Sequence, residues 1–252
     1  MRSYIDITYG KLNAPLQKLD IHLPDGDGPF PIFVYFHGGG LEEGDKSKMR
    51  TCESVVKLGI GIATVNYRMY PDAKYPEFIE DAAEAVAWVY ENIGKYCKYN
   101  GIYVGGSSAG GYLSMMLCFD KQWLAKYGIS PTDITGFIHN AGQPTAHFNV
   151  LKYNGIDPKR VIIDETAPLY HIGVDEKYPP MIFLVADNDL ENRYEQTLLT
   201  VSTLKHFGHT EPNVKFKVVP GKHTSYGADE NGITIFAKLA AEFISETNES
   251  AE

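Results

Sequence analysis

Seven short segments of the chain are rich in β-branched and aromatic residues, and several read as nearly continuous apolar runs. Runs of this kind are typical of strands whose two faces are both covered. We therefore predict strands at residues 18–23, 32–36, 60–65, 101–104, 136–139, 181–186 and 214–219.

Between these segments, apolar positions repeat with the 3.6-residue period of an amphipathic helix. Residues 78–93 and 236–243 carry this pattern. A third helix is predicted to bury one apolar face, formed by Tyr194, Leu198, Val201 and Leu204. Gly208 follows it, where a C-terminal glycine cap belongs. Strands that alternate with helices predict an α/β fold, with a mostly parallel sheet covered by helices on both faces.

One connection is longer than the usual loop, because about 40 residues separate the strand ending near position 140 from the strand beginning at 181. A segment of this length is more often a functional insertion than slack chain. We predict a single domain over residues 1–252, with a lid insertion at 142–179 that holds one or two short helices.

Composition and charge exclude several classes of function. The 252 residues are 44% hydrophobic and 22% charged, and the formal net charge of −9 is not offset by any run of Lys and Arg. Such a surface would repel a phosphate backbone, so nucleic-acid binding is not expected. Uninterrupted apolar runs stay near six residues, far short of the roughly 20 that span a bilayer, so no membrane partner is expected.

The first residues, Met1 to Asp6, carry charge where a signal peptide would need its apolar stretch. We therefore expect a soluble cytoplasmic protein, although a chain whose signal has been removed would look the same. Cys52, Cys97 and Cys118 are an odd number without CxxC spacing. They indicate neither a disulfide framework nor a zinc site, and reduced thiols are expected.

A glycine- and serine-rich segment lies between a predicted strand and a helical pattern. Its residues Gly106-Ser107-Ser108-Ala109-Gly110 fit the sequence G-x-S-x-G. In that motif the serine is a nucleophile on a sharp strand-to-helix turn, and small flanking residues let strand and helix approach each other. A phosphate-binding loop would need a Lys after its last Gly, which is missing here. The motif predicts Ser108 as a nucleophile.

A second glycine run, Gly38 to Gly40, follows His37 directly after the predicted strand at 32–36. Acyl-transfer enzymes must supply hydrogen-bond donors to the oxyanion of the tetrahedral intermediate. A glycine run at the end of a strand can turn its backbone N–H groups inward because no Cβ stands in the way. The alternative is a simple tight turn, which the G-x-S-x-G segment downstream makes a weaker interpretation.

Together these segments resemble the hormone-sensitive-lipase-like branch of the α/β-hydrolases, the HGGG carboxylesterases. The family run of Y-R-x-x-P, P, E-D and W is also matched, by Tyr67, Arg68, Pro71, Pro76, Glu80, Asp81 and Trp88. The resemblance extends over nearly the whole chain from Leu19 onward. It implies the three-layer α/β-hydrolase fold, a Ser–Asp–His triad in that chain order, and an oxyanion hole formed by the N–H groups of Gly38, Gly39 and Ala109.

The family pattern also implies the other two members of the triad. Two aspartates, Asp187 and Asp189, follow the predicted strand at 181–186, and the register of the family pattern selects Asp189. Asp187 is then expected to brace the loop. The base should lie in the loop after the last strand, where His223 stands. The other histidines are interpreted as structural or surface residues, and His37 as part of the oxyanion loop.

The resemblance predicts a carboxylic ester hydrolase that acts on small-molecule esters and needs neither a metal ion nor an organic cofactor. Larger members have a long N-terminal cap, which this chain lacks, so it looks more like compact bacterial esterases, including those that remove acetyl or feruloyl groups from plant polysaccharides. Two alternatives stay open: an arylformamidase-like amidase, and a non-catalytic binding protein that kept the fold. The sequence leaves the oligomeric state open, a homodimer included.

Overall fold

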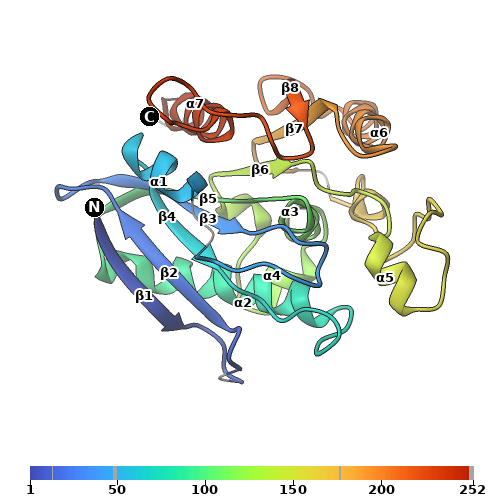
Figure 1. Cartoon of the computed structure of the whole chain (residues 1–252), viewed down its shortest axis with the longest axis horizontal. Coiled ribbons are helices and arrows are strands. Elements are labelled where there is room, and N and C mark those ends of the chain that lie inside the picture. Colours follow the sequence, from blue (N-terminus) through green and yellow to red (C-terminus); the bar gives the residue numbers. More distant parts are fainter. Residues whose placement is uncertain (13, 48–49, 176, 250–252) are drawn as a thin grey trace.

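The computed structural model describes residues 1–12, 14–47, 50–175 and 177–249. Within these residues, eight strands form one sheet in the order β1-β2-β4-β3-β5-β6-β7-β8 (Figure 1). Their bounds are β1 Arg2–Thr8, β2 Lys18–Leu23, β3 Phe30–Phe36, β4 Gly61–Val65, β5 Tyr99–Ser107, β6 Gly136–Asn140, β7 Met181–Asn188 and β8 Val214–Lys222. Strands β3 to β8 run parallel, and β2 is antiparallel to both β1 and β4.

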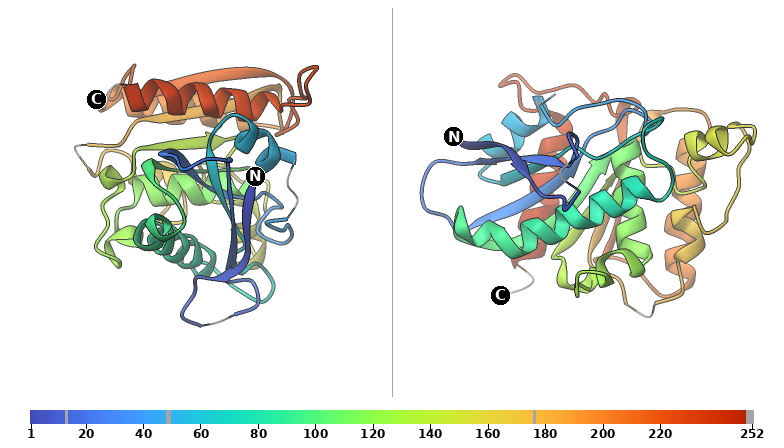
Figure 2. Two further views of the ribbon diagram at one scale, coloured as in Figure 1. Left: turned by 90° about the vertical axis from the view of Figure 1, so that its left-hand side faces the viewer. Right: turned by 90° about the horizontal axis from the view of Figure 1, so that it is seen from below.

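Helices cover both faces of the sheet, as the alternating pattern predicts. On one face α1 (Arg50–Lys57) and α7 (Ile235–Glu249) pack over a core that includes Phe33 and Ile138. On the other face α2 (Glu77–Asn92), α3 (Ala109–Phe119), α4 (Gln122–Ala125) and α6 (Arg193–His206) pack over a larger core. In the right-hand view of Figure 2, α2 and α3 lie in front of the sheet and α7 lies behind it. The predicted α/β fold is confirmed.

All seven predicted strands are present; β3, β5, β6, β7 and β8 are longer than predicted, and β4 begins one residue later. The edge strand β1 was not predicted, because six of its seven residues are exposed and its sequence therefore carries no apolar signal. Its backbone pairs with β2, with Arg2 opposite Leu23. The charged N-terminal segment is thus a strand at the edge of the sheet.

The predicted apolar face of α6 is only half right. Val201 and Leu204 are buried, but Tyr194 and Leu198 are 36% and 39% exposed. The buried face of the helix consists instead of Arg193, Thr197, Thr200, Val201 and Leu204. The threonine hydroxyls donate hydrogen bonds to backbone carbonyls one turn earlier, which satisfies them in the core. Gly208 follows the helix with φ +87°, as a C-terminal cap does.

The insertion between β6 and β7 holds one short α-helix, α5 (Phe148–Tyr153), and the short 3₁₀ helix η3 (Pro168–His171). Two further 3₁₀ helices are η1 (Ile93–Lys95) and η2 (Pro131–Asp133). In Figure 1 α5 stands apart from the layered body, at the side where β6 and β7 end. The predicted short helices are present, and a lid role for residues 142–179 stays a prediction.

The strand order determines where a ligand site can form. The chain leaves β3 toward β4 on one side, and β5 lies on the other side of β3. Connections that diverge in this way leave a crevice at the carboxyl ends of the two strands. The glycine run at 38–40 follows β3 and Ser108 follows β5, so both predicted segments meet at this crevice.

Candidate active site

Ser108 occupies a strained turn between β5 and α3. Its backbone has φ 56° and ψ −113°, a conformation that is costly for a residue with a side chain. The turn requires close approach of its neighbours, since a Cβ added to Gly110 would lie 2.0 Å from the carbonyl oxygen of Phe36. Helix α3 begins at Ala109, so the positive end of its dipole is directed at the serine.

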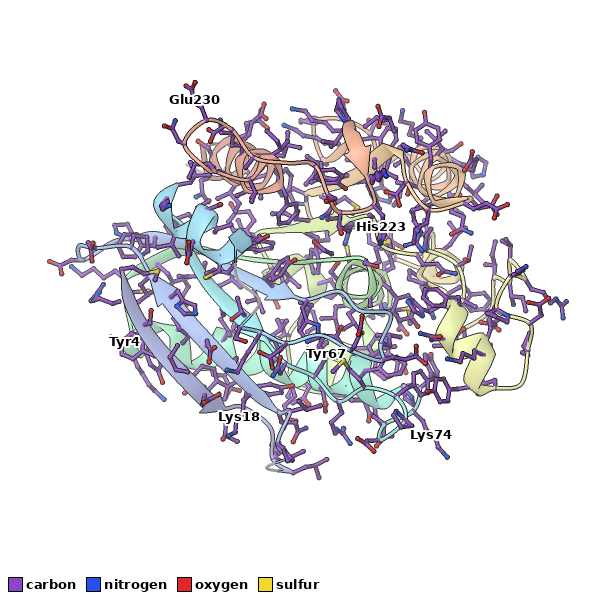
Figure 3. All side chains as sticks on the ribbon, viewed as in Figure 1. Tyr4, Lys18, Tyr67, Lys74, His223 and Glu230 are labelled. Atoms are coloured by element: carbon purple, nitrogen blue, oxygen red, sulfur yellow. The ribbon has the colours of Figure 1, made fainter. Side chains whose placement is uncertain are left out.

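The structure brings together the three residues predicted as a triad. His223 Nε2 lies 2.8 Å from Ser108 Oγ, and His223 Nδ1 lies 2.5 Å from Asp189 Oδ1. Asp189 comes directly after β7, and His223 comes directly after β8. Figure 3 shows His223 between β8 and the end of α3. The carboxyl ends of three parallel strands therefore supply one continuous hydrogen-bonded chain.

Asp189 is held as an ionised acceptor. Its side chain is 1% exposed. Burial alone would raise the pKa of this carboxyl, but hydrogen bonds from His223 and from the backbone N–H groups of Ala186 and Leu190 outweigh it and leave the pKa below its ordinary value. Asp187 instead accepts a hydrogen bond from the N–H of Gly221 at 2.9 Å, which braces the loop carrying His223.

The glycine loop after β3 lies against Ser108. A Cβ on Gly38 would lie 3.2 Å from the Cβ of Ser108. Gly39 has φ +114°, and its carbonyl accepts hydrogen bonds from the N–H groups of Glu42 and Glu43, which fold the loop back on itself. Ala109 is the first residue of α3, so its N–H has no partner within the helix. Gly38 and Ala109 therefore lie beside Ser108, and Gly39 lines the same cavity. The role of these three residues as oxyanion donors stays a prediction.

Tyr67 and Arg68, two residues of the motif that resembles the HGGG carboxylesterases, contribute to holding the glycine loop in place. The buried Tyr67 hydroxyl donates to the carbonyl of His37 at 2.8 Å, and its ring stacks on the His37 ring with centroids 4.5 Å apart. The neighbouring Arg68 binds the buried carboxylate of Asp81 on α2, with its Nη2 at 2.7 Å. These contacts tie the strand end that carries the glycine loop to the body of the sheet.

A cavity of about 790 Å³ opens at this point. Besides the glycine loop, Ser108 and His223, it is lined by polar side chains that include Glu42, Thr51, Ser107, Asn140 and Asn149. Its apolar side chains include Phe148, Leu190 and Phe236. The cavity thus lies directly over the Ser108–His223 pair and is of mixed polarity.

Ser107 faces a different set of partners from Ser108. Its hydroxyl oxygen accepts hydrogen bonds from Tyr35 Oη at 3.0 Å and from Asn140 Nδ2 at 2.8 Å. Asn140 Oδ1 in turn accepts from the hydroxyl of Tyr226 at 2.6 Å. Ser107 is therefore part of a polar network in the cavity wall, whereas the hydrogen bond to His223 Nε2 belongs to Ser108.

Two side chains at the site were not predicted from the sequence. Arg193, at the start of α6, is 5% exposed and donates to the carbonyl of Ala141 at 2.5 Å. Asn149, on α5, is 2% exposed and donates to the carbonyl of Gly40 at 2.6 Å. Both connect segments far apart in sequence, and the sequence carries no local motif that marks them.

The other candidate groups lie away from the cavity. His139 is buried against Ser114, and His147 accepts a hydrogen bond from the N–H of Asn149 at the start of α5. All three cysteines are free thiols. Among residues 1–12, 14–47, 50–175 and 177–249, no cluster of three His, Cys, Asp or Glu side chains is arranged to hold a metal ion. No helix in the same part of the chain is both long and apolar enough to cross a membrane.

Known proteins with similar sequences include hydrolases and a receptor. The chain is 30% identical over 140 residues to the carboxylic ester hydrolase LipN of Mycobacterium tuberculosis, an alignment that covers 52% of this chain and 36% of LipN. It is 28% identical over 132 residues to the kynurenine formamidase of Danio rerio, covering 52% of this chain and 43% of that enzyme. The aligned part of the chain thus spans less than half the length of either curated relative.

The fold is similar to that of solved esterase structures. A truncated form of a carbohydrate esterase from gut microbiota superposes with a TM-score of 0.78, covering 99% of this chain and 97% of that chain at 18% identity. The molecule therefore has the α/β-hydrolase fold. Residues 19–204, well over half of the sequence, match one protein family. The chain belongs to this family, BD-FAE, within the α/β-hydrolases.

Proposed function

We propose that the chain is a serine esterase that hydrolyses carboxylic esters through an acyl-enzyme. The observation that carries the proposal is the unbroken hydrogen-bonded chain from Ser108 Oγ through both ring nitrogens of His223 to Asp189 Oδ1, at 2.8 and 2.5 Å. This arrangement, at the floor of a cavity, supports nucleophilic attack on a bound carbonyl group. The ester hydrolase LipN among its relatives supports the same reaction class.

The mechanism follows from the contacts of the three residues. His223 Nε2 takes the proton from Ser108 Oγ as the oxygen attacks the ester carbonyl, and it then gives that proton to the leaving alcohol. Asp189 fixes the imidazole so that Nδ1 carries its proton and Nε2 is free to act as base. Because the pKa of Asp189 is lowered, this carboxylate stays negative and stabilises the imidazolium that forms.

The N–H groups of Gly38, Gly39 and Ala109 stabilise the negative charge that develops on the carbonyl oxygen. Gly38 approaches Ser108 closely enough that any Cβ would touch it. The N–H of Ala109 lies at the positive end of α3, which favours negative charge. Water then attacks the acyl-enzyme by the same proton transfers, and no step requires a cofactor.

The cavity supports small acyl groups, or compact aromatic ones such as feruloyl, in preference to long chains. Its apolar side chains include Phe148, Leu190 and Phe236, while most of its other side chains are polar. A long acyl chain gains about 0.8 kcal/mol per buried methylene only where an apolar channel receives it. Acetyl or feruloyl groups on plant carbohydrate fit this description, and the carbohydrate esterase of similar fold supports the choice.

Hydrolysis of formylkynurenine is a second candidate, because one relative is a kynurenine formamidase. The same three residues would serve that amide. The two functions are separated by comparing kcat/KM for 4-nitrophenyl esters from acetyl to decanoyl, acetylated xylo-oligosaccharides, methyl ferulate and N-formylkynurenine, with Ser108→Ala as the blank. The esterase proposal expects the highest value for an ester. A higher value for formylkynurenine would replace it with the amidase.

A non-catalytic binding protein remains the third alternative. A fluorophosphonate probe reacts preferentially with an activated serine. The esterase proposal expects covalent labelling that disappears in His223→Ala. A folded chain that binds esters but neither turns them over nor reacts with the probe would establish the binding protein instead.

A further inference from the structure

The short helix α5 grips the glycine loop after β3 at two points. Asn149 Nδ2 donates to the carbonyl of Gly40 at 2.6 Å, across 109 positions of sequence. Lys152 Nζ forms an ion pair with Glu42 at 2.7 Å. The contact with Lys152 contributes most to lowering the pKa of the Glu42 carboxyl.

Of these two interactions, the hydrogen bond from Asn149 to Gly40 is the more buried. Asn149 is 2% exposed, whereas Lys152 is about half exposed. A pair exposed to that degree contributes little to a fixed geometry, while a buried amide that loses its acceptor leaves two polar groups without partners. Gly40 has φ +65° and the ring of Phe148 lies beside it, so the peptide has little room to turn.

Helix α5 is itself anchored to the side of the cavity that carries the triad. The N–H of Asn149 donates to His147 Nδ1 at 3.2 Å. Burial lowers the pKa of His147 to about 3, so the ring is neutral and Nδ1 accepts. The N–H of Phe148 donates to Gln143 Oε1, which also accepts from the buried Arg193 on α6. The helix is therefore part of a fixed frame.

The geometry points to Asn149 as a positioning residue that sets the direction of the oxyanion donors, an inference that rests on the proposed esterase function. By holding the Gly40 carbonyl outward, the Asn149 amide orients the peptide chain that runs back through Gly39 to Gly38. Their N–H groups then face Ser108. The insertion thus supplies a structural part of the candidate oxyanion hole, in addition to any lid role.

A donor that is misdirected loses transition-state stabilisation without losing substrate binding. Removing one oxyanion donor outright costs about 10²–10³ in kcat, and an error of about 1 Å in position costs on the order of 10². We therefore expect Asn149→Ala to lower kcat for an oxygen ester on the order of tenfold to a hundredfold. KM should change much less, because the ground-state contacts remain.

The test compares each oxygen ester with its thionoester, in which sulfur replaces the carbonyl oxygen. Sulfur is larger and accepts hydrogen bonds weakly, so the thionoester gains little from the oxyanion donors and reacts slowly with the wild type. Rates are measured for 4-nitrophenyl acetate and its thiono analogue and are normalised by active-site titration. A mere loss of folded enzyme lowers both rates equally and leaves their ratio unchanged.

Asn154→Ala is the matched control, because Asn154 ends the same helix and its side chain is exposed. Asn149→Leu is the second variant, since it keeps the volume but cannot donate. We expect the oxygen-to-sulfur rate ratio to fall about tenfold or more in both Asn149 variants and to stay at the wild-type value in the control.

An unchanged ratio in folded Asn149 variants, with the wild type fully active, would overturn this inference and leave the esterase proposal intact. Failure of both variants to fold would also overturn it, because Asn149 would then hold the fold and not the loop. A wild type without ester turnover would overturn the proposed function itself.

Discussion

The two sides of the cavity are built in different ways. On one side Ser108, Asp189 and His223 follow the carboxyl ends of β5, β7 and β8, and the hydrogen-bonded register of the sheet brings them together. On the other side the loop at 38–40 leaves the sheet and is held by side chains, above all Asn149 from the insertion. The position of the proposed nucleophile is therefore set by the backbone of the sheet. The positions of the proposed oxyanion donors depend instead on single side-chain contacts.

The two adjacent serines give the largest contrast on the sheet-built side. Ser108→Ala should lower kcat by about 10⁴-fold or more, because triad members act as a unit. Ser107→Ala should be mild, at most about tenfold, because its hydroxyl accepts hydrogen bonds from Tyr35 and Asn140 and not the bond that links Ser108 to His223. Steady-state kinetics on 4-nitrophenyl acetate measure both. If the order were reversed, the assignment of the motif register would be wrong.

The two aspartates after β7 give the next contrast. Asp189→Asn should lower kcat by about 10³–10⁴-fold, because an amide cannot hold the proton of His223 on Nδ1. The fold should survive, as a circular dichroism spectrum would show. Asp187→Asn is the matched control and should lose far less turnover, because Asp187 accepts a hydrogen bond from the backbone of Gly221 near the end of β8, whereas His223 is bonded to Asp189. A larger loss in the Asp187 variant would move the triad acid to that residue.

The pH dependence should report the histidine alone. Histidine changes its charge between pH 5 and 8. The lowered pKa of Asp189 keeps this carboxylate ionised throughout that range. On the acid side kcat/KM should therefore rise with pH by roughly tenfold per unit, because a single catalytic base must be unprotonated to act, and then level off. A profile that is flat from pH 5 to 8 would argue against histidine as the base.

The smallest effect concerns the acyl group, where both sides of the cavity contribute. We expect kcat/KM to be highest for acyl groups of about two to four carbons or for compact aromatic ones, and to fall for octanoyl and longer chains. No activation at lipid–water interfaces is expected. Octanoyl or decanoyl esters that outperform acetyl by tenfold, a preference of about 1.4 kcal/mol, would reveal an apolar channel and contradict the leaning toward carbohydrate esters.

The same division between the two sides explains what the sequence could predict. Buried strands such as β3 and β5 can be predicted from their apolar runs. The spacing of Gly106, Ser108 and Gly110 likewise predicts the turn between strand and helix. The edge strand β1 was missed because neither of its faces is buried. On α6 the apolar pattern wrongly predicted that Leu198 is buried, although it is 39% exposed. Threonines are buried on this helix instead, because their hydroxyls bond to carbonyls of the same helix.

Asn149 and Arg193 could not be predicted for a different reason. Each acts through a hydrogen bond to a backbone carbonyl of a distant segment, at Gly40 and Ala141. A carbonyl acceptor exists at every residue, so the partner leaves no trace in the sequence. Contacts of this kind become visible only when the fold places the segments side by side.

Mapping of a fluorophosphonate adduct tests the central claim most directly, because it identifies the activated oxygen itself. The wild-type chain would be labelled, digested and sequenced by tandem mass spectrometry across the Ser107–Ser108 pair, with His223→Ala treated in parallel. The account predicts one adduct, on Ser108, and none in the His223 variant. An adduct on Ser107, or no adduct on a chain that hydrolyses esters, would contradict it.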